Sequence, residues 1–362
     1  MTPWPDNNTA VALRAKLAES LDPTGSSDWR LAFETVPRHL FVPRFLEQRD
    51  GTWEPVRWGD AGFLEAVYAD DALTTQVDAH NLPTSSSSQP SVMLAMLDAL
   101  DARPGDRVLE LGTGTGYNLA LLASRLGDQD LVSIEPDTGL VQDAITRLGQ
   151  LGHRPRIVAG DGTLGYPNNA PYQRIIATFA LPAGIPRALL DQLAPDGVIV
   201  APLGHGIVRL VHHGDGHATG QFLPSDVRFM TARHTSPNGP ALDAARQAPA
   251  RTSTTTPESL FTDRIGFPLS LALPRHTTCS WKNPAGQIEA VAIWLPDGST
   301  ALADTDGTVR QTGPRRLWDI VEGLAQRLPQ SVERHDVHLT VTPTEQTATH
   351  TPSGTHWPLA KH

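Results

Sequence analysis

The nine residues from Val108 to Gly116 constrain the fold more than any other part of the chain. They read Val-Leu-Glu-Leu-Gly-Thr-Gly-Thr-Gly, an apolar run followed by glycines at alternate positions. Glycine adopts positive φ angles and has no Cβ to obstruct a ligand, and the apolar helix expected next would present free amides to that ligand. The run therefore predicts a ligand-binding turn between a strand and a helix. Its candidate contact residues are Glu110, Gly112, Thr113, Gly114, Thr115, Gly116 and Tyr117.

The spacing of these glycines distinguishes between two kinds of nucleotide-binding sheet. A dinucleotide-binding turn requires G-x-G-x-x-G. Here the third glycine, Gly116, comes one residue early, and Tyr117 stands where that pattern places its last glycine. The spacing favours the class I methyltransferase form of the Rossmann-like sheet, which binds S-adenosylmethionine.

Residues 84–235 alternate short apolar runs with segments of helical periodicity, which is typical of a parallel α/β sheet. Buried strands are expected at 108–111, 131–135, 156–160, 174–180 and 197–204. Helices are expected at 92–100, 139–149 and 185–193.

Two acidic residues follow later strands of this sheet. Glu135 ends the second strand, where its carboxylate can accept hydrogen bonds from both hydroxyls of a ribose. Asp161 lies in Gly-Asp-Gly after the third strand, where Asp161 and Gly162 would meet an adenine. Taken singly, Glu135 also fits a helix cap before Pro136, and residues 160–162 fit an ordinary turn. Because open α/β sheets bind ligands at the carboxyl ends of their strands, the ordered set predicts S-adenosylmethionine as cofactor and S-adenosylhomocysteine as product.

The expected fold class is α/β, a class I methyltransferase sheet with an N-terminal extension and a smaller C-terminal α+β domain. Residues 1–83 form the extension, on the substrate side, with helices near 10–20 and 29–36. Residues 84–235 form the cofactor-binding domain.

The remaining residues divide into a linker and a C-terminal domain. Residues 236–258 are rich in Ala, Pro, Ser and Thr without a hydrophobic period, which is typical of a linker. Residues 259–362 form the α+β domain, with a helix expected from Gly313-Pro314 to residue 328. Its expected strands lie at 269–274, 277–281, 289–295 and 337–341.

Charge and composition argue against several classes of partner. The chain has 362 residues and a formal net charge of −10, and its 29 Lys and Arg residues form no run. Nucleic-acid and anionic membrane surfaces are therefore not expected as partners. Cys279 is the only cysteine, and neither a signal peptide nor an apolar run long enough to span a bilayer is readable. We expect a cytoplasmic protein.

With these features in hand, the chain resembles the protein-L-isoaspartate O-methyltransferase family over about residues 29–205. The resemblance includes Tyr68-Ala-Asp70 with Leu73 and Ser88-Gln89-Pro90. Longer matching motifs are VPRHLFVP (36–43), VLELGTGTGYNLALLA (108–123), SIEPD (133–137), GDGTLGYPNNAPYQRIIATFA (160–180) and IPRALLDQLAPDGVIVAPLG (185–204).

The resemblance implies roles for individual residues. In the family, the serine that matches Ser88 sits beside the transferable methyl group and contacts the substrate carboxylate. Acids matching Glu135 and Asp161 hold the nucleoside, and the glycine turn holds the methionine part. Candidate substrate-binding residues are Ser86, Ser87, Gln89, Tyr68 and Asp70. A flexible linker is the alternative interpretation of the serine run.

The chain also departs from the family pattern. Thr84–Ser88 replaces the usual Gly-x-x-x-Thr-Ile-Ser, and Leu73-Thr74-Thr75 replaces Leu-Pro-Ile. Repair enzymes of the family are typically single-domain, whereas about a hundred residues follow the expected linker here. These departures bear on which substrate is methylated more than on the methyl-transfer reaction itself.

A narrower resemblance accommodates the departures. VYADDALTTQ (67–76), GPRRLWDIVE (313–322) and LTVTPTEQ (339–346) resemble an actinobacterial branch encoded beside ATP-grasp enzymes that mature ribosomal peptides, the graspetides. Its members are similar to enzymes that methylate an aspartate in a crosslinked peptide. The ester then closes to an aspartimide, which persists or hydrolyses to isoaspartate.

The chemistry needs no general base, because an aspartate carboxylate with a pKa near ~3.9 is already ionised at neutral pH. No metal site is expected either: His212, His213 and His217 surround Gly-Asp-Gly, which indicates a hairpin turn. Three functions remain open at this point. They are aspartate methylation in a crosslinked ribosomal peptide, general isoaspartate repair, and a non-catalytic cofactor-binding scaffold that recruits a partner.

Overall fold

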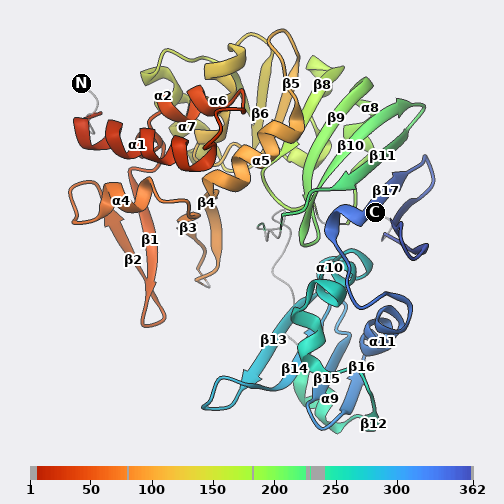
Figure 1. Cartoon of the computed structure of the whole chain (residues 1–362). Coiled ribbons are helices and arrows are strands. Elements are labelled where there is room, and N and C mark those ends of the chain that lie inside the picture. Colours follow the sequence, from red (N-terminus) through yellow and green to blue (C-terminus); the bar gives the residue numbers. More distant parts are fainter. Residues whose placement is uncertain (1–5, 80, 182, 226–228, 230–240, 360–362) are drawn as a thin grey trace. The chain divides into compact units, whose positions relative to one another are not determined.

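The computed structural model describes residues 6–79, 81–181, 183–225, 229 and 241–359 (Figure 1). Their contacts divide the chain into two compact units. The first unit comprises Met1–Ala180, Pro186–Ala201 and Arg209–Gly216, and the second comprises Leu181–Ile185, Pro202–Val208 and His217–His362.

A parallel sheet forms the centre of the first unit (Figure 1). The strand order is β9-β8-β5-β6-β7. Every residue of β5 and β6 is buried, whereas the edge strand β7 has two half-buried and two exposed residues. The bounds are β5 (Val108–Leu111), β6 (Leu131–Glu135), β7 (Arg156–Ala159), β8 (Tyr172–Ala177) and β9 (Leu193–Leu203), with β10 (Gly206–Gly214) next to β9.

Helices pack along this sheet as the sequence predicts. The stripe of Met93, Met96, Leu97 and Leu100 is buried, because apolar residues three and four apart share one helix face. The helix between β8 and β9 is shorter than the expected 185–193. It starts after Pro186 and ends at Asp191, and β9 begins at Leu193. The helices are α5 (Pro90–Leu100), α6 (Tyr117–Leu126), α7 (Thr138–Gln150) and α8 (Arg187–Asp191), with short 3₁₀ turns η1 (Gly162–Leu164) and η2 (Pro167–Asn169).

The N-terminal segment contains a second sheet that the sequence analysis missed. It is a four-stranded antiparallel sheet in the order β2-β1-β3-β4. The last strand, β4 (Pro83–Ser87), belongs to this sheet, so the expected domain boundary at residue 83 falls inside the strand. The other elements are α1 (Asn8–Leu21), α2 (Arg30–Thr35), α3 (Arg38–Phe41), β1 (Arg44–Arg49), β2 (Thr52–Arg57), α4 (Phe63–Val67) and β3 (Leu73–Val77).

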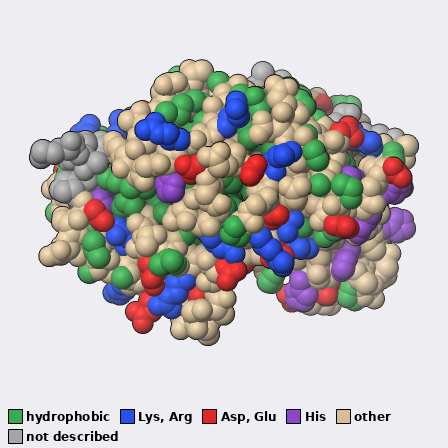
Figure 2. Space-filling view, turned by 90° about the horizontal axis from the view of Figure 1, so that it is seen from above, with side chains coloured by type: hydrophobic (Ala, Val, Ile, Leu, Met, Phe, Trp, Pro, Cys, Tyr) green, Lys and Arg blue, Asp and Glu red, His purple; other side chains and the backbone are tan. Residues whose placement is uncertain are grey.

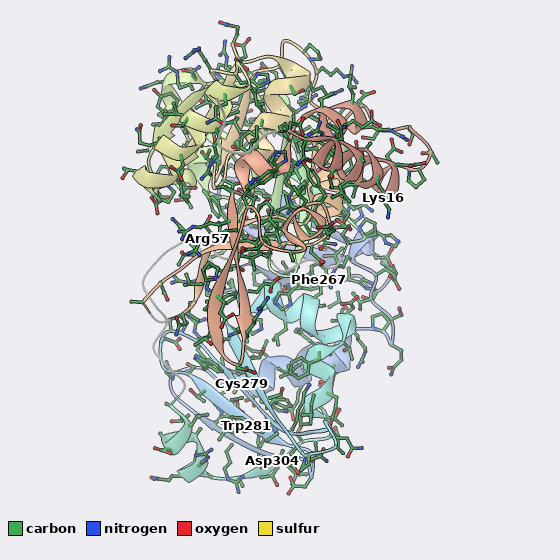
Figure 3. The ribbon with its side chains drawn as sticks, turned by 90° about the vertical axis from the view of Figure 1, so that its left-hand side faces the viewer. Lys16, Arg57, Phe267, Cys279, Trp281 and Asp304 are labelled. Atoms are coloured by element: carbon green, nitrogen blue, oxygen red, sulfur yellow. The ribbon has the colours of Figure 1, made fainter. Side chains whose placement is uncertain are left out.

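The second unit contains two antiparallel arrangements of strands. One runs in the order β11-β17-β18-β19 and the other in the order β12-β16-β15-β14-β13. Cys279 and Trp281 lie at alternate positions of the edge strand β13 (Figure 3). The strands are β11 (His217–Phe222), β12 (Arg251–Thr252), β13 (Thr277–Lys282), β14 (Ile288–Trp294), β15 (Thr300–Asp304), β16 (Thr308–Thr312), β17 (Val337–Val341), β18 (Gln346–His350) and β19 (Thr355–Pro358).

Several expectations for this part of the chain were wrong. The described part of the expected linker is ordered: α9 (Leu242–Gln247) buries Ala245 against Ala292 and Leu302, and η3 begins at Pro257. Residues 269–272, expected as a strand, belong to the helix α10 (Asp263–Ala272). Its residues from Ile265 to Leu271 are all buried, and a short buried apolar run has no period that separates helix from strand.

The last helix also begins later than expected. Gly313 and Pro314 precede it, and α11 (Leu317–Arg327) starts three residues after the proline. The final 3₁₀ turns are η3 (Pro257–Phe261) and η4 (Arg334–Asp336). The turn expected at Gly214-Asp215-Gly216 is present, and all three residues have positive φ angles.

Candidate active site

The glycine turn joins β5 to α6 as predicted. Gly112, Gly114 and Gly116 have φ angles of 93°, 53° and 87°, all in the region that favours glycine. Gly116 is the N-cap of α6, so the first amides of that helix face the carboxyl end of the sheet. The backbone geometry required for close approach of a ligand is therefore built into the turn.

Two other segments of the chain lie next to the turn, one beside Gly112 and one beside Gly114. A Cβ on Gly112 would lie 2.6 Å from Thr178 Oγ1, on the segment that follows β8. A Cβ on Gly114 would lie 3.8 Å from the carbonyl oxygen of Ser86 and 4.0 Å from Ser85 Oγ. The glycine turn thus lies beside the serine strand β4.

The buried Glu110 supports the turn through a chain of hydrogen bonds. Glu110 is fully buried on β5 and accepts hydrogen bonds from Ser133 Oγ at 2.5 Å and Asn118 Nδ2 at 2.8 Å. Ser133 Oγ also lies 2.5 Å from Thr113 Oγ1, inside the turn. Burial raises the pKa of Glu110 from 4.5 to about 7. The carboxyl group predicted to contact the ligand instead anchors the turn through Ser133.

Glu135 reaches the turn from the next strand. Its Oε2 accepts a hydrogen bond from the Gly114 amide at 2.9 Å, and its Oε1 accepts one from the Asp137 amide at 3.1 Å. Each carboxylate oxygen has a further lone pair. Glu135 can therefore hold the turn and still accept hydrogen bonds from two hydroxyl groups.

Asp161 lies at the end of the third strand, as predicted. It caps η1 by accepting hydrogen bonds from the Thr163 amide at 2.9 Å and the Thr163 hydroxyl at 2.8 Å, both through Oδ1. Gly162 is buried next to it, and a Cβ there would lie 3.2 Å from Phe179 Cε1. Phe179, which the sequence analysis did not select, is thus a neighbour of both Gly112 and Gly162.

Thr115 and Tyr117 contribute to the turn differently from what was predicted. The Thr115 carbonyl accepts a hydrogen bond from Arg147 Nη1 at 3.2 Å. The Tyr117 ring is 1% exposed and packs against Phe33 and Phe41. The Tyr117 side chain is therefore part of the core, and only its backbone belongs to the turn.

The four serines of the run divide into two kinds. Ser85 and Ser87 are buried, and their hydroxyls bond to Thr75 Oγ1 at 3.1 Å and Arg38 Nε at 3.2 Å. Ser86 and Ser88 are half-buried, and their hydroxyls form no hydrogen bond within the described part of the chain. The Ser87 hydroxyl is thus bonded inside the protein, and its expected contact with substrate stays a prediction.

Arg38 holds the serine strand in place, and the sequence analysis missed it. The side chain is fully buried, yet burial lowers the pKa only to about 10, so the guanidinium stays charged at neutral pH. Its donors reach main-chain carbonyls of residues 67–71 and of the end of the serine run. The acceptors are the carbonyls of Val67, Ala69, Asp71, Ser87 and Ser88, at 2.9 to 3.3 Å. The sequence feature that could have identified Arg38 is its position as a charged residue inside the mostly apolar run VPRHLFVP.

Asp70, Gln89 and Tyr68 have structural contacts. Asp70 Oδ1 accepts a hydrogen bond of 2.8 Å from the Ser91 amide, which lies at the start of α5. Asp70 Oδ2 accepts one of 3.2 Å from Gln89 Nε2. The Tyr68 hydroxyl lies 2.7 Å from His39 Nδ1, and the residue is 5% exposed. Tyr68 therefore lies in the core of the N-terminal segment, and its expected contact with substrate stays a prediction.

The surface carries charges of both signs. On the face that Figure 2 shows, Lys and Arg side chains lie among Asp and Glu side chains instead of in one basic patch. None of the described helices is long and apolar enough to cross a membrane. Within the described residues, no group of three or more His, Cys, Asp or Glu side chains is arranged to hold a metal ion.

Comparisons with known proteins agree with this geometry. The family model for protein-L-isoaspartate (D-aspartate) O-methyltransferase matches residues 15–235. A protein-L-isoaspartate O-methyltransferase of Azorhizobium caulinodans is 38% identical over 233 residues, which are 62% of this chain and 94% of that protein. One of Methanoculleus marisnigri is 38% identical over 187 residues, or 50% of this chain and 72% of that protein.

A solved structure extends the fold similarity into the second unit. A protein-L-isoaspartate O-methyltransferase with 23% sequence identity superposes with a TM-score of 0.55 over 91% of this chain and 97% of its own. This likeness concerns the fold of the residues after 235. The chain belongs to the protein-L-isoaspartate O-methyltransferase family, and it is an S-adenosylmethionine-dependent carboxyl O-methyltransferase.

Proposed function

We propose that this enzyme methylates the side-chain carboxylate of an aspartate in a crosslinked ribosomal peptide, and that Ser88 orients that carboxylate. The observation that supports this most directly is the division of the serine run. Ser85 and Ser87 are bonded inside the protein, whereas the Ser86 and Ser88 hydroxyls form no hydrogen bond within the described residues. Such hydroxyls can donate to a carboxylate that lies near the glycine turn.

The residues of the turn fit the methyl donor. The three glycines leave room for the methionine part, and Glu135 keeps acceptor capacity for the two ribose hydroxyls. Asp161 and Gly162 lie where the adenine is expected, after β7. When bound, S-adenosylmethionine supplies an electrophilic methyl group on a positively charged sulfur.

The chain's own residues align and desolvate the reactants. The substrate carboxylate attacks in line, so that an oxygen–carbon bond forms while the carbon–sulfur bond breaks, and the two opposite charges cancel. No proton moves, because the carboxylate is already ionised at neutral pH. Orientation is therefore the main contribution of the protein, and a hydroxyl that donates to the non-attacking oxygen provides it.

General isoaspartate repair is the second candidate. It is favoured by the family match over residues 15–235 and by the isoaspartate methyltransferase structure that superposes on 91% of this chain. The crosslinked peptide is favoured by the replacement of the family's Gly-x-x-x-Thr-Ile-Ser with Thr84–Ser88 and by the short motifs at 67–76, 313–322 and 339–346.

One experiment separates the two candidates. The full chain is incubated with S-adenosylmethionine and either a generic isoaspartyl hexapeptide or an ATP-grasp-crosslinked precursor peptide, and the products are weighed by mass spectrometry. We expect the crosslinked peptide to gain one methyl group and then to lose one water relative to its starting mass, as ester and imide form. Turnover of the isoaspartyl peptide alone would leave repair as the function.

The role of Ser88 is tested in the same assay. Ser88→Ala should lower kcat about tenfold, because one oriented hydrogen bond is worth roughly 1–1.5 kcal/mol. The KM for S-adenosylmethionine should not change. Ser87→Ala is the matched control: it loses the bond to Arg38, so it should lower the free energy of unfolding by about 1 kcal/mol and affect kcat less than Ser88→Ala. Equal kcat values for Ser88→Ala and wild type would contradict the role.

A further inference from the structure

Phe179 follows β8 and is fixed at the carboxyl end of the sheet by its neighbour in the chain. The Thr178 amide donates to the Leu111 carbonyl at 2.9 Å. The Thr178 hydroxyl donates to the carbonyls of Leu111 at 3.1 Å and Gly112 at 2.6 Å. The backbone is therefore held against the first glycine of the turn, and the Phe179 ring projects from this point.

One edge of the ring contacts two loops of the site. A Cβ on Gly112 would lie 3.0 Å from Phe179 Cδ1, and a Cβ on Gly162 would lie 3.2 Å from Cε1 and 3.3 Å from Cζ. Gly112 follows β5 and Gly162 follows β7, two strands that have β6 between them. The ring therefore lies across the carboxyl ends of the strands, where parallel sheets bind their ligands.

The burial of Phe179 differs from that of the residues before it. Ile175, Ile176 and Ala177 are at most 1% exposed and belong to the core, whereas Phe179 is only half-buried. Two glycines, which have no side chain, lie along one edge of the ring, and the half-buried residue keeps part of its surface accessible. A ring that only filled the core would be covered on all sides.

We infer that Phe179 determines the affinity for the methyl donor by providing an aromatic surface on which the adenine base stacks. Stacking of a base on an aromatic ring is favourable and does not depend on the polar groups at the edge of the base. Asp161, beside Gly162, would recognise that edge, whereas Phe179 would bind the flat face. This inference concerns the donor and holds whichever peptide is methylated.

The test measures binding without turnover. Calorimetry on the full chain gives the Kd of S-adenosylhomocysteine and of its inosine analogue, which lacks the exocyclic amine. The proteins are wild type, Phe179→Ala, Phe179→Leu and the control Phe261→Ala, which changes an exposed phenylalanine of the second unit. Thermal unfolding of each unliganded variant is measured alongside, and Phe179→Leu, which keeps most of the side-chain volume, decides the question if Phe179→Ala does not fold.

We expect Phe179→Ala to weaken the binding of both compounds about tenfold, or about 1.4 kcal/mol. Phe179→Leu should have an intermediate effect and Phe261→Ala none. The ratio of the two Kd values should stay as in wild type, because stacking does not involve the exocyclic amine.

Two results would overturn the inference. One is unchanged affinity for S-adenosylhomocysteine in the Phe179 variants. The other is a ratio of the two Kd values that falls to about one, which would mean that Phe179 acts only by positioning the Asp161 loop. A wild-type protein that binds the compound in a Phe179-dependent way but methylates neither test peptide would refute the proposed function and leave this inference standing.

Discussion

The glycine turn and the serine strand lie side by side in the first unit, but they are held in place differently. The turn rests on groups of the adjacent strands: Glu135 binds its Gly114 amide, and Ser133 and Glu110 support Thr113. The strand β4 has four Thr or Ser residues among its five, and so it buries little apolar surface of its own. Its position depends on Arg38, which precedes Ser87 by 49 residues.

This difference suggests how such an enzyme can change substrate without changing cofactor. Arg38 binds the carbonyl oxygens of Ser87 and Ser88, and every residue has a carbonyl oxygen. The side chains of the serine strand other than Ser87, whose hydroxyl also bonds to Arg38, can therefore vary while the backbone stays in position. At Gly112 and Gly116 of the turn, by contrast, positive φ angles and close contacts favour glycine alone. The departure of Thr84–Ser88 from the family pattern falls in the segment that tolerates variation.

The largest expected effect comes from removing the residue that holds the serine strand. Arg38→Met would leave five carbonyls, three in residues 67–71 and those of Ser87 and Ser88, without their donor, and each buried unsatisfied polar group costs about 1–3 kcal/mol. Because water can reach some of these groups, we expect the free energy of unfolding to fall by about 4 kcal/mol, measured by urea denaturation.

Arg44→Met is the matched control, because Arg44 is an exposed arginine on β1. Its effect should stay within about 0.5 kcal/mol. If Arg38→Met unfolded at the same urea concentration as this control, the serine strand would have to be held by other contacts. The stated difference between the glycine turn and the serine strand would then be wrong.

The next largest effect concerns the support of the glycine turn. Burial raises the pKa of Glu110 from 4.5 to about 7, so the folded protein binds this proton more tightly than the unfolded chain does. Its contribution to stability is therefore fully present below pH 4.5 and is lost as the pH rises to about 7. The free energy of unfolding of wild type, relative to Glu110→Gln, should fall by roughly 2–3 kcal/mol between about pH 5 and pH 7.5.

Denaturation curves of the two proteins across this range check the prediction. Other carboxyl groups titrate in both proteins, so the difference between the curves isolates Glu110. Parallel pH profiles would show that Glu110 is ionised at neutral pH and that its bonds to Ser133 and Asn118 stabilise the charge.

Two glycine substitutions separate the steric role of the turn from its binding role. In Gly112→Ala the new Cβ meets Thr178 Oγ1 at 2.6 Å and the Phe179 ring at 3.0 Å, at a φ of 93°. In Gly114→Ala the nearest atom is 3.8 Å away, and a φ of 53° lies in the left-handed region that other residues can enter. The free energy of unfolding should fall by roughly 2–3 kcal/mol for Gly112→Ala and about 1 kcal/mol for Gly114→Ala.

Binding should respond differently from stability. Both variants should bind S-adenosylhomocysteine at least about tenfold more weakly by calorimetry, because each added methyl group occupies space at the turn. Normal binding by a stably folded Gly114→Ala would show that the ligand does not approach the side of the turn that faces Ser86.

The two regions also differ in how well the sequence predicts them. The strands β5 and β6 match their expected bounds to the residue, because fully buried apolar runs leave little ambiguity. The strands β1 and β2 read RFLEQR and TWEPVR and have mostly exposed side chains, so they carry no clear alternation. They exist because they pair with each other, which a local pattern does not reveal.

The sequence also does not show in which direction the side chains at the site point, for a similar reason. The glycine pattern identifies the backbone of the turn, but it does not tell which way the Tyr117 side chain points. The serine run indicates hydroxyls near the site, but only the bond from Arg38 Nε to the Ser87 hydroxyl separates Ser87 from Ser88. Phe179 was overlooked because its relevance comes from contacts with Gly112 and Gly162, which are distant from it in the sequence.

The smallest expected effect tests whether Tyr68, which lies in the core, also contacts the substrate. Its hydroxyl lies 2.7 Å from His39 Nδ1, and burial raises the pKa of the phenol to about 12, so it stays neutral in any assay near neutral pH. Tyr68→Phe removes this hydrogen bond but keeps the ring that packs with Phe63 and Val67. We expect the free energy of unfolding to fall by about 1 kcal/mol and kcat/KM for the peptide to stay within about twofold of wild type. A fall in kcat/KM with unchanged stability would require the phenol to reach the peptide, and a side chain that is 5% exposed can do so only if the N-terminal core opens during catalysis.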